Sequence, residues 1–99
     1  FRWSEYLSKG KDVAAPIHLF LNPFPISPNC FEIGMKLEAI DPENCSLFCV
    51  CSIVEVRGYR LKLSFDGYSS MYDFWVNADS QDIFPPGWCD ETARVLQAP

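Results

Sequence analysis

The clearest strand pattern in the chain is Arg60–Phe65 (RLKLSF), and the pair Asp66-Gly67 interrupts it at once. Strict alternation of apolar and polar side chains is typical of a strand that buries one face, and Asp-Gly is typical of a turn. The stretch Phe65–Val76 (FDGYSSMYDFWV) then holds five aromatic residues in twelve positions, beside two aspartates. The pattern therefore predicts a strand that ends in a turn rich in aromatic rings.

Similar patterns extend outward from this strand. Met35–Ala39 alternates apolar and charged residues, which predicts a second, half-buried strand. Asp41–Asn44, with proline at the second position, and Arg57–Tyr59 have the composition of tight turns. We expect strands at 34–40, 47–56, 60–65, 72–76 and 83–84. Short strands with tight turns favour an all-β fold, a small antiparallel barrel or meander.

The two ends of the chain carry helix signals. Trp3, Tyr6 and Leu7 share one face of a helix predicted over 3–9, and Pro16 opens a second short turn. We interpret residues 1–30 as an arm that has no core of its own, so it must pack on later residues or on a neighbouring domain. Three prolines over 23–28 exclude regular structure there. At the other end we expect a short helix over 90–96, capped by Asp90.

Composition limits the classes of partner. The chain has 99 residues, which suits one domain, and a net charge of −5 with a pI of about 4.6. Eight Lys and Arg are scattered among thirteen acids, so no basic patch predicts direct nucleic-acid binding. An acidic surface favours a basic partner such as a Lys/Arg-rich peptide. We see no apolar run of about 18 residues, so we expect no membrane span.

Catalysis and metal binding are not expected. Three of the five cysteines fall within one seven-residue apolar segment, and the only histidine is His18. Zinc sites need paired cysteines or cysteine–histidine clusters, so we interpret the thiols as small buried side chains in a reducing compartment. A nucleophile would need a base, and His18 lies alone in the arm. There is no glycine-rich phosphate loop. We therefore expect no catalytic residue, no metal site and no cofactor.

Strand order brings two loops together. If strand 34–40 runs up, strand 47–56 runs down and strand 60–65 runs up, so loops 41–46 and 66–72 share a rim. Three rings there can surround a methylated ammonium, whose cationic methyl groups meet the negative ring faces. A carboxylate can accept a hydrogen bond from the N–H that mono- and dimethyl-lysine retain and trimethyl-lysine lacks. The residues concerned are Phe65, Tyr68 and Tyr72 for the rings, Asp41 for the carboxylate, and Asn44 to orient Asp41 or narrow the rim.

Purely structural readings of the same residues stay open. Rings in a small barrel usually belong to its core, and Asp41 before a proline can be a turn residue. Asp66 and Asp73 are interpreted as turn and capping residues. Trp75 and Trp88 are interpreted as packing anchors rather than as walls of a ligand site.

The order of several short motifs resembles a malignant brain tumour (MBT) repeat of the lethal(3)malignant-brain-tumour-like Polycomb-group proteins. The resemblance covers nearly the whole chain, and its motifs are Phe1-x-Trp3-x-x-Tyr6-Leu7, Ala14-Ala15-Pro16, Leu19-Phe20, Gly34–Glu38, Asp66-Gly67-Tyr68, Asp73-Phe74-Trp75, Ala78-Asp79-Ser80 and Gly87-Trp88-Cys89.

This resemblance implies an SH3-like, Tudor-like barrel over residues 31–97 with the N-terminal arm over 1–30, as one of several tandem repeats. It implies a nuclear, chromatin-associated reader that takes mono- or dimethyl-lysine of histone tails into an aromatic cage, with neighbouring repeats as further partners. The cage positions fall on Phe65, Tyr68, Tyr72, Asp41 and Asn44. The alternative is a structural repeat whose cage is unused.

Two residues depart from the family pattern. Tyr68 stands where strong binders have tryptophan, which gives a smaller ring face. Cys45 stands where proline is typical, so the loop after Asn44 is expected to be less rigid.

Overall fold

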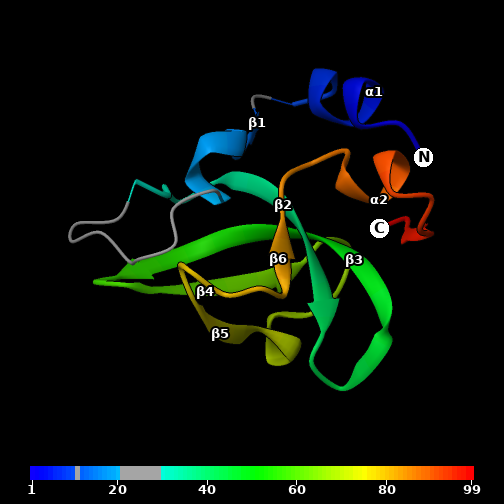
Figure 1. Ribbon diagram of the computed structural model, residues 1–99. Coiled ribbons are helices and arrows are strands. Elements are labelled where there is room, and N and C mark those ends of the chain that lie inside the picture. The colour runs from blue at the N-terminus through cyan, green and yellow to red at the C-terminus, as the bar shows by residue number, and fades with distance from the viewer. Residues whose placement is uncertain (11, 21–29) are drawn as a thin grey trace.

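A computed structural model describes residues 1–10, 12–20 and 30–99, so the predicted effect of the prolines at 23–28 lies outside the described residues. The chain forms one curved seven-stranded sheet with short helices beside it (Figure 1). In chain order the elements are α1 (Trp3–Ser8), β1 (Val13–Ala14), the 3₁₀ helix η1 (Ile17–Phe20), β2 (Met35–Asp41), β3 (Asn44–Arg57), β4 (Arg60–Phe65), the 3₁₀ helix η2 (Ser70–Tyr72), β5 (Phe74–Asn77), β6 (Ile83–Phe84), α2 (Trp88–Glu91) and β7 (Leu96–Gln97).

Strands β2 to β5 form an antiparallel meander in chain order, as the turn signals predict. The β2–β3 turn is tight because the Asp41 Oδ1 accepts a hydrogen bond of 2.9 Å from the Glu43 backbone N–H. The β3–β4 turn places Gly58 at φ +60°, a conformation that glycine adopts without steric cost. Both predicted turns are therefore confirmed.

The core is an apolar layer between the strands. Leu37, Ile53, Leu61 and Leu63 are 0–1% exposed and form its centre. In β4 the alternation holds, since the two leucines are buried while Arg60 is exposed and Lys62 is half-buried. The arm contributes Ala15, which is buried, together with the half-buried side chains of η1.

The prediction that β2 is half-buried is wrong. All residues from Met35 to Ala39 are buried, including Lys36 at 8% and Glu38 at 0% exposure. The second face of this strand is covered because the arm and the start of the α2 segment both donate hydrogen bonds to Glu38. Charged side chains tolerate such burial only when hydrogen-bonded or paired, and both of these are.

The predicted helix over 90–96 is also wrong. Helix α2 begins after Gly87 and ends near Thr92, because Ala93 adopts φ +57°. The Arg94 N–H then bonds the Cys89 carbonyl at 2.8 Å and the Ala93 N–H bonds the Asp90 carbonyl at 3.3 Å, a Schellman ending. The chain thereby reverses, and Leu96–Gln97 becomes strand β7.

Three further expectations need correction. The strand predicted from residue 72 begins at Phe74, because Ser69 caps the turn of η2 that holds Tyr72. The sheet is not wholly antiparallel, since β1 pairs in parallel with β2 and β7 with β3. Among the described residues no strand pairing joins β5 to β6, so the strand ladder does not close into a ring.

Candidate functional site

A cavity of ≈ 730 Å³ opens where the β2–β3 turn meets the segment after β4. Its remaining wall comes from the residues around β7. The lining residues are Asp41, Pro42, Glu43, Leu47, Cys49, Val50, Phe65, Asp66, Tyr68, Met71, Tyr72, Asp73, Phe74, Gln97, Ala98 and Pro99. Loops 41–46 and 66–72 thus meet at one rim, as strand order predicts.

Three aromatic rings stand at steep angles to one another along this cavity. The ring centroids of Phe65 and Tyr68 are 6.1 Å apart with planes at 68°, and those of Tyr68 and Tyr72 are 6.4 Å apart at 89°. The two tyrosines are 65% and 56% exposed, so they are not core residues, while Phe65 is half-buried against Phe74. Rings arranged in this way present walls that face different directions.

Local backbone structure fixes where each ring points. Phe65 is the last residue of β4 and pairs with Cys51, and a turn follows in which the Tyr68 N–H bonds the Phe65 carbonyl at 3.1 Å. Gly67 makes this turn possible because its φ is +83°. Tyr72 is held at the end of η2, where its N–H bonds the Ser69 carbonyl at 3.1 Å.

Acidic groups give the cavity a negative character. Asp41 is half-buried, and its charge, after burial, is the second cause of the raised pKa of the Cys49 thiol. The neighbouring thiol is therefore neutral at physiological pH. Asp73 also lines the cavity, and its Oδ1 is buried without a hydrogen-bond partner among the described residues. Four acidic residues line the cavity, namely Asp41, Glu43, Asp66 and Asp73, and Asp66 is already paired with Lys36. Carboxylates beside aromatic rings favour an organic cation over an anion.

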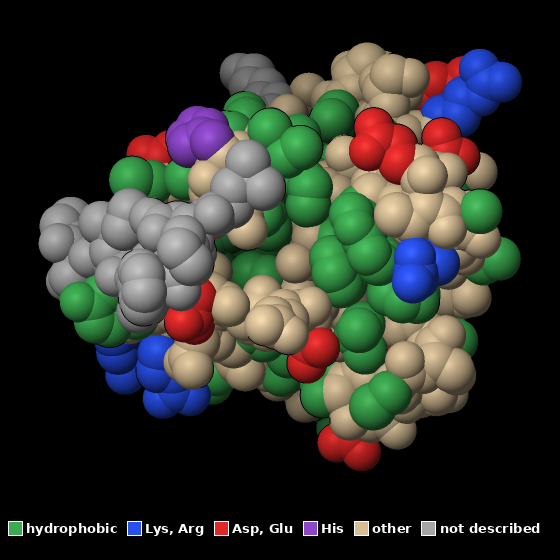
Figure 2. Space-filling view, viewed as in Figure 1, with side chains coloured by type: hydrophobic (Ala, Val, Ile, Leu, Met, Phe, Trp, Pro, Cys, Tyr) green, Lys and Arg blue, Asp and Glu red, His purple; other side chains and the backbone are tan. Residues whose placement is uncertain are grey.

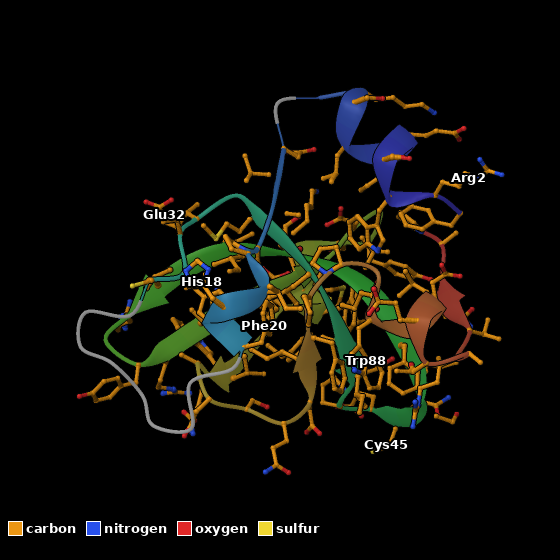
Figure 3. All side chains as sticks on the ribbon, turned by 45° about the horizontal axis from the view of Figure 1, so that its top comes forward. Arg2, His18, Phe20, Glu32, Cys45 and Trp88 are labelled. Atoms are coloured by element: carbon orange, nitrogen blue, oxygen red, sulfur yellow. The ribbon has the colours of Figure 1, made fainter. Side chains whose placement is uncertain are left out.

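Asn44 is the one predicted site residue that the structure keeps out of this cavity. It is exposed, and its Oδ1 accepts hydrogen bonds from the Ser46 N–H at 3.2 Å and the Ser46 hydroxyl at 2.6 Å. It is paired with Asp41 only through the strand register. Cys45 is exposed in the same hairpin (Figure 3).

Sequence patterns missed the role of Asp66. This residue occupies a turn as predicted, but its side chain is only 6% exposed and forms an ion pair with Lys36 at 2.5 Å. The cavity also includes Met71, Cys49 and residues 97–99, none of which the sequence singled out. No sequence pattern pointed to this pair, because Lys36 lies in a strand whose alternation of apolar and charged residues predicts an exposed charged face.

The tryptophans lie away from the cavity. Trp88 stacks on Phe84 with centroids 3.7 Å apart, and Trp75 lies beneath the guanidinium groups of Arg57 and Arg60. Trp88 is therefore a packing anchor as predicted, whereas Trp75 supports a charged surface.

In the described part of the chain, the thiols and His18 do not gather into a metal-binding group. Cys51 and Cys89 are buried as predicted, but Cys30 and Cys45 are exposed. His18 lies on the surface in η1 beside hydrophobic side chains (Figure 2). In the described part of the chain no cluster of three potential ligands could hold a metal, and no helix is long and apolar enough to cross a membrane.

Comparison with known proteins identifies the family. Residues 35–99 match the family model of the MBT repeat. The chain is 56% identical to human lethal(3)malignant brain tumor-like protein 4 and 50% identical to chicken lethal(3)malignant brain tumor-like protein 1. Each match covers 98% of the present chain. It spans only 16% and 12% of those two relatives.

A solved structure agrees. The whole chain superposes, with a TM-score of 0.71 and 40% identity, on 22% of a chain of the four MBT repeats of Drosophila melanogaster Sfmbt, crystallised with the peptide RHR(me)KVLR. Sequence and fold together place this chain in the MBT repeat family.

Proposed function

We propose that this chain is a chromatin reader module that binds mono- or dimethyl-lysine of histone tails in the cavity at the β2–β3 rim. The observation that carries the proposal is the set of three steeply inclined rings beside the Asp41 carboxylate. The related Sfmbt repeats, crystallised with a methyl-lysine peptide, support it.

The chemistry follows from the residues. The faces of Phe65, Tyr68 and Tyr72 attract the methylated ammonium by cation–π contacts, each worth about 0.5–2 kcal/mol. Asp41 accepts the hydrogen bond of a retained N–H and offsets the charge, which favours mono- and dimethyl-lysine over trimethyl-lysine. Because one side chain buries little area, the Kd is expected to be on the order of 0.1–1 mM.

Asn44 has a different place in the proposal. Its Oδ1 is engaged by Ser46 and the residue does not line the cavity, so we assign it to shaping the hairpin. We expect the other four predicted residues, Asp41, Phe65, Tyr68 and Tyr72, to contact the ligand.

The wider setting belongs to the same proposal. We place the module in the nucleus, with neighbouring MBT repeats as further partners, no enzymatic activity, and no direct contact with nucleic acid or membrane. We assign the curved sheet to the SH3-like, Tudor-like barrels, with residues 1–30 as arm and 31–97 as core of a single repeat. The competing function is a scaffold repeat with an unused cage, which the occupied amide of Asn44 favours.

The test is an NMR titration of labelled protein with unmodified, mono-, di- and trimethyl-lysine peptides. We expect shifts clustered at 41–46 and 66–72 with the mono- and dimethyl peptides only. Asp41→Asn and Tyr72→Ala should abolish them. Matched controls are Asp79→Asn and Tyr59→Ala, which alter an exposed acid and an exposed ring outside the cavity and should bind normally. A folded wild type that shows no shift at millimolar peptide would favour the scaffold.

A further inference from the structure

A partly buried hydrogen-bond network lies directly behind the cavity. The Asp66 Oδ1 accepts from the Ser52 hydroxyl at 2.6 Å, while its Oδ2 accepts from the Lys36 ammonium at 2.5 Å and from the Tyr6 hydroxyl. Lys36 also donates to Ser52 at 2.7 Å and lies 5.4 Å from the centre of the Tyr6 ring. The side chains of Lys36 and Asp66 are 10% and 6% exposed.

Asp66 lies in the chain between Phe65 and Tyr68, two of the rings of the proposed site. It follows Phe65 and precedes Gly67 and Tyr68, and it lines the cavity itself. Its N–H bonds the Val50 carbonyl at 3.0 Å, which joins the turn to β3. Because a buried carboxylate keeps one position only while its donors are in place, these donors also fix the turn that carries the rings.

Helix α1 reaches the sheet through two donors, and only one of them is next to the cavity. The Trp3 Nε1–H donates to the Glu38 Oε2 at 2.7 Å, and Glu38 is not a cavity residue. Tyr6, one turn further along the same helix, donates to Asp66. The rings of Trp3 and Tyr6 lie 6.0 Å apart on one helix, but their donors reach different acceptors, so each donor can be removed separately.

We propose that Tyr6 is a positioning residue for the methyl-lysine pocket, acting through Asp66 on the turn that carries Phe65 and Tyr68. The inference rests on the proposed function of that pocket. It makes the N-terminal arm part of the binding module although Tyr6 does not line the cavity. If methyl-lysine binds only when the turn at 66–68 is ordered, its binding must also stabilise the contact between helix α1 and Asp66.

Two phenylalanine substitutions on one helix test the proposal. Tyr6→Phe removes the donor to Asp66 and keeps the ring, whereas Trp3→Phe removes the donor to Glu38. For Tyr6→Phe we expect faster amide hydrogen exchange and displaced NMR signals at 66–72 in the free protein, and roughly tenfold weaker binding of a monomethyl-lysine peptide. Trp3→Phe leaves the Tyr6 donor in place, so we expect changes at α1 and 87–89, unchanged NMR signals at 66–72, and a Kd within about twofold of the wild type.

Combining Tyr6→Phe with a change at Asp66 shows whether Tyr6 acts through Asp66 or through a general loosening of helix α1. In the Asp66→Ala background, which has no side-chain acceptor for the Tyr6 hydroxyl, Tyr6→Phe should change hydrogen exchange at 66–72 and the Kd no further. The proposal is overturned if Tyr6→Phe leaves the signals of residues 66–72 and the Kd unchanged. It is also overturned if Trp3→Phe changes both as much as Tyr6→Phe does, since the effect would then be a general one of the helix. A wild type that binds no methyl-lysine peptide would refute the proposed function, while exchange at 66–72 in the free variants would still decide the role of Tyr6.

Discussion

At the scale of single residues, Glu38 joins three segments of the chain. It is fully buried in β2 and accepts hydrogen bonds from the Trp3 Nε1–H at 2.7 Å, the Gly87 N–H at 2.7 Å and the Cys89 N–H at 2.8 Å. No lysine or arginine forms an ion pair with it among the described residues. Its burial is therefore compensated by neutral donors from the arm and from the start of α2.

Removing this carboxylate should cost more than a typical surface change. Glu38→Ala leaves three donors without their acceptor, so we expect the free energy of unfolding to fall by about 3 kcal/mol or more. Urea denaturation followed by circular dichroism measures the change. Glu43→Ala, at an exposed position of the β2–β3 turn, is the control and should stay within about 0.5 kcal/mol of the wild type. Equal losses in the two variants would contradict the role of Glu38.

At the scale of elements, the segment between β4 and β5 is shaped by a backbone that few side chains permit. Gly67 has φ +83°, and a Cβ there would lie 3.3 Å from the Pro99 carbonyl carbon. Gly58, between β3 and β4, has φ +60° but no atom within 4 Å of such a Cβ. Both glycines thus have a positive φ that disfavours other residues, but only at Gly67 would an added Cβ meet a neighbouring atom.

This difference predicts unequal effects of alanine. Gly58→Ala should lower the free energy of unfolding by about 1 kcal/mol, the usual cost of a left-handed conformation for an L-residue. Gly67→Ala should lower it further, because residues 97–99 must also move. It should also displace the NMR signals of Tyr68, which Gly58→Ala leaves in place. Equal losses of stability would show that the approach of Pro99 imposes no constraint.

At the scale of the whole molecule, folding withdraws several weak acids from water. Burial, followed by a hydrogen bond to Glu38 and its charge, raises the pKa of Cys89 to about 12. Burial, followed by nearby acidic charges, also raises the pKa of Cys51. The pKa of Tyr6 is raised by burial and then by its hydrogen bond to Asp66. The native state therefore keeps protons that the unfolded chain releases.

Stability should accordingly decline in alkaline solution. Above the ordinary thiol pKa of 9.0 the unfolded chain binds fewer protons than the native state, so the free energy of unfolding falls as pH rises from about 9 to about 12. Denaturation curves at several pH values would show this slope, and Cys89→Ala should reduce it. Cys45→Ala, at an exposed thiol, is the control that should leave it unchanged. A flat profile above pH 9 would contradict the prediction.

Local sequence patterns were sufficient to predict the meander and to bring Asp41, Phe65, Tyr68 and Tyr72 to one cavity. Alternation over 60–65 marked the buried face of β4, and proline and glycine marked the turns, because these preferences act within a few residues. Strand order then placed Asp41 at the same rim as the three rings. Whether this set binds methyl-lysine stays a proposal, and Asn44 lies outside the cavity, where its Oδ1 accepts from Ser46.

The sequence by itself determined the periodicity of the strands, the positions of the turns and the family. Only the tertiary structure decided that β2 is buried on both faces, that the chain reverses at Ala93 to form β7, and that Asp66 meets Tyr6 and Lys36. The physical reason is the distance along the chain over which each effect acts. Backbone preferences are read over a few neighbouring residues, whereas the burial of a charge depends on donors from distant parts of the chain: Tyr6 lies 60 positions from Asp66.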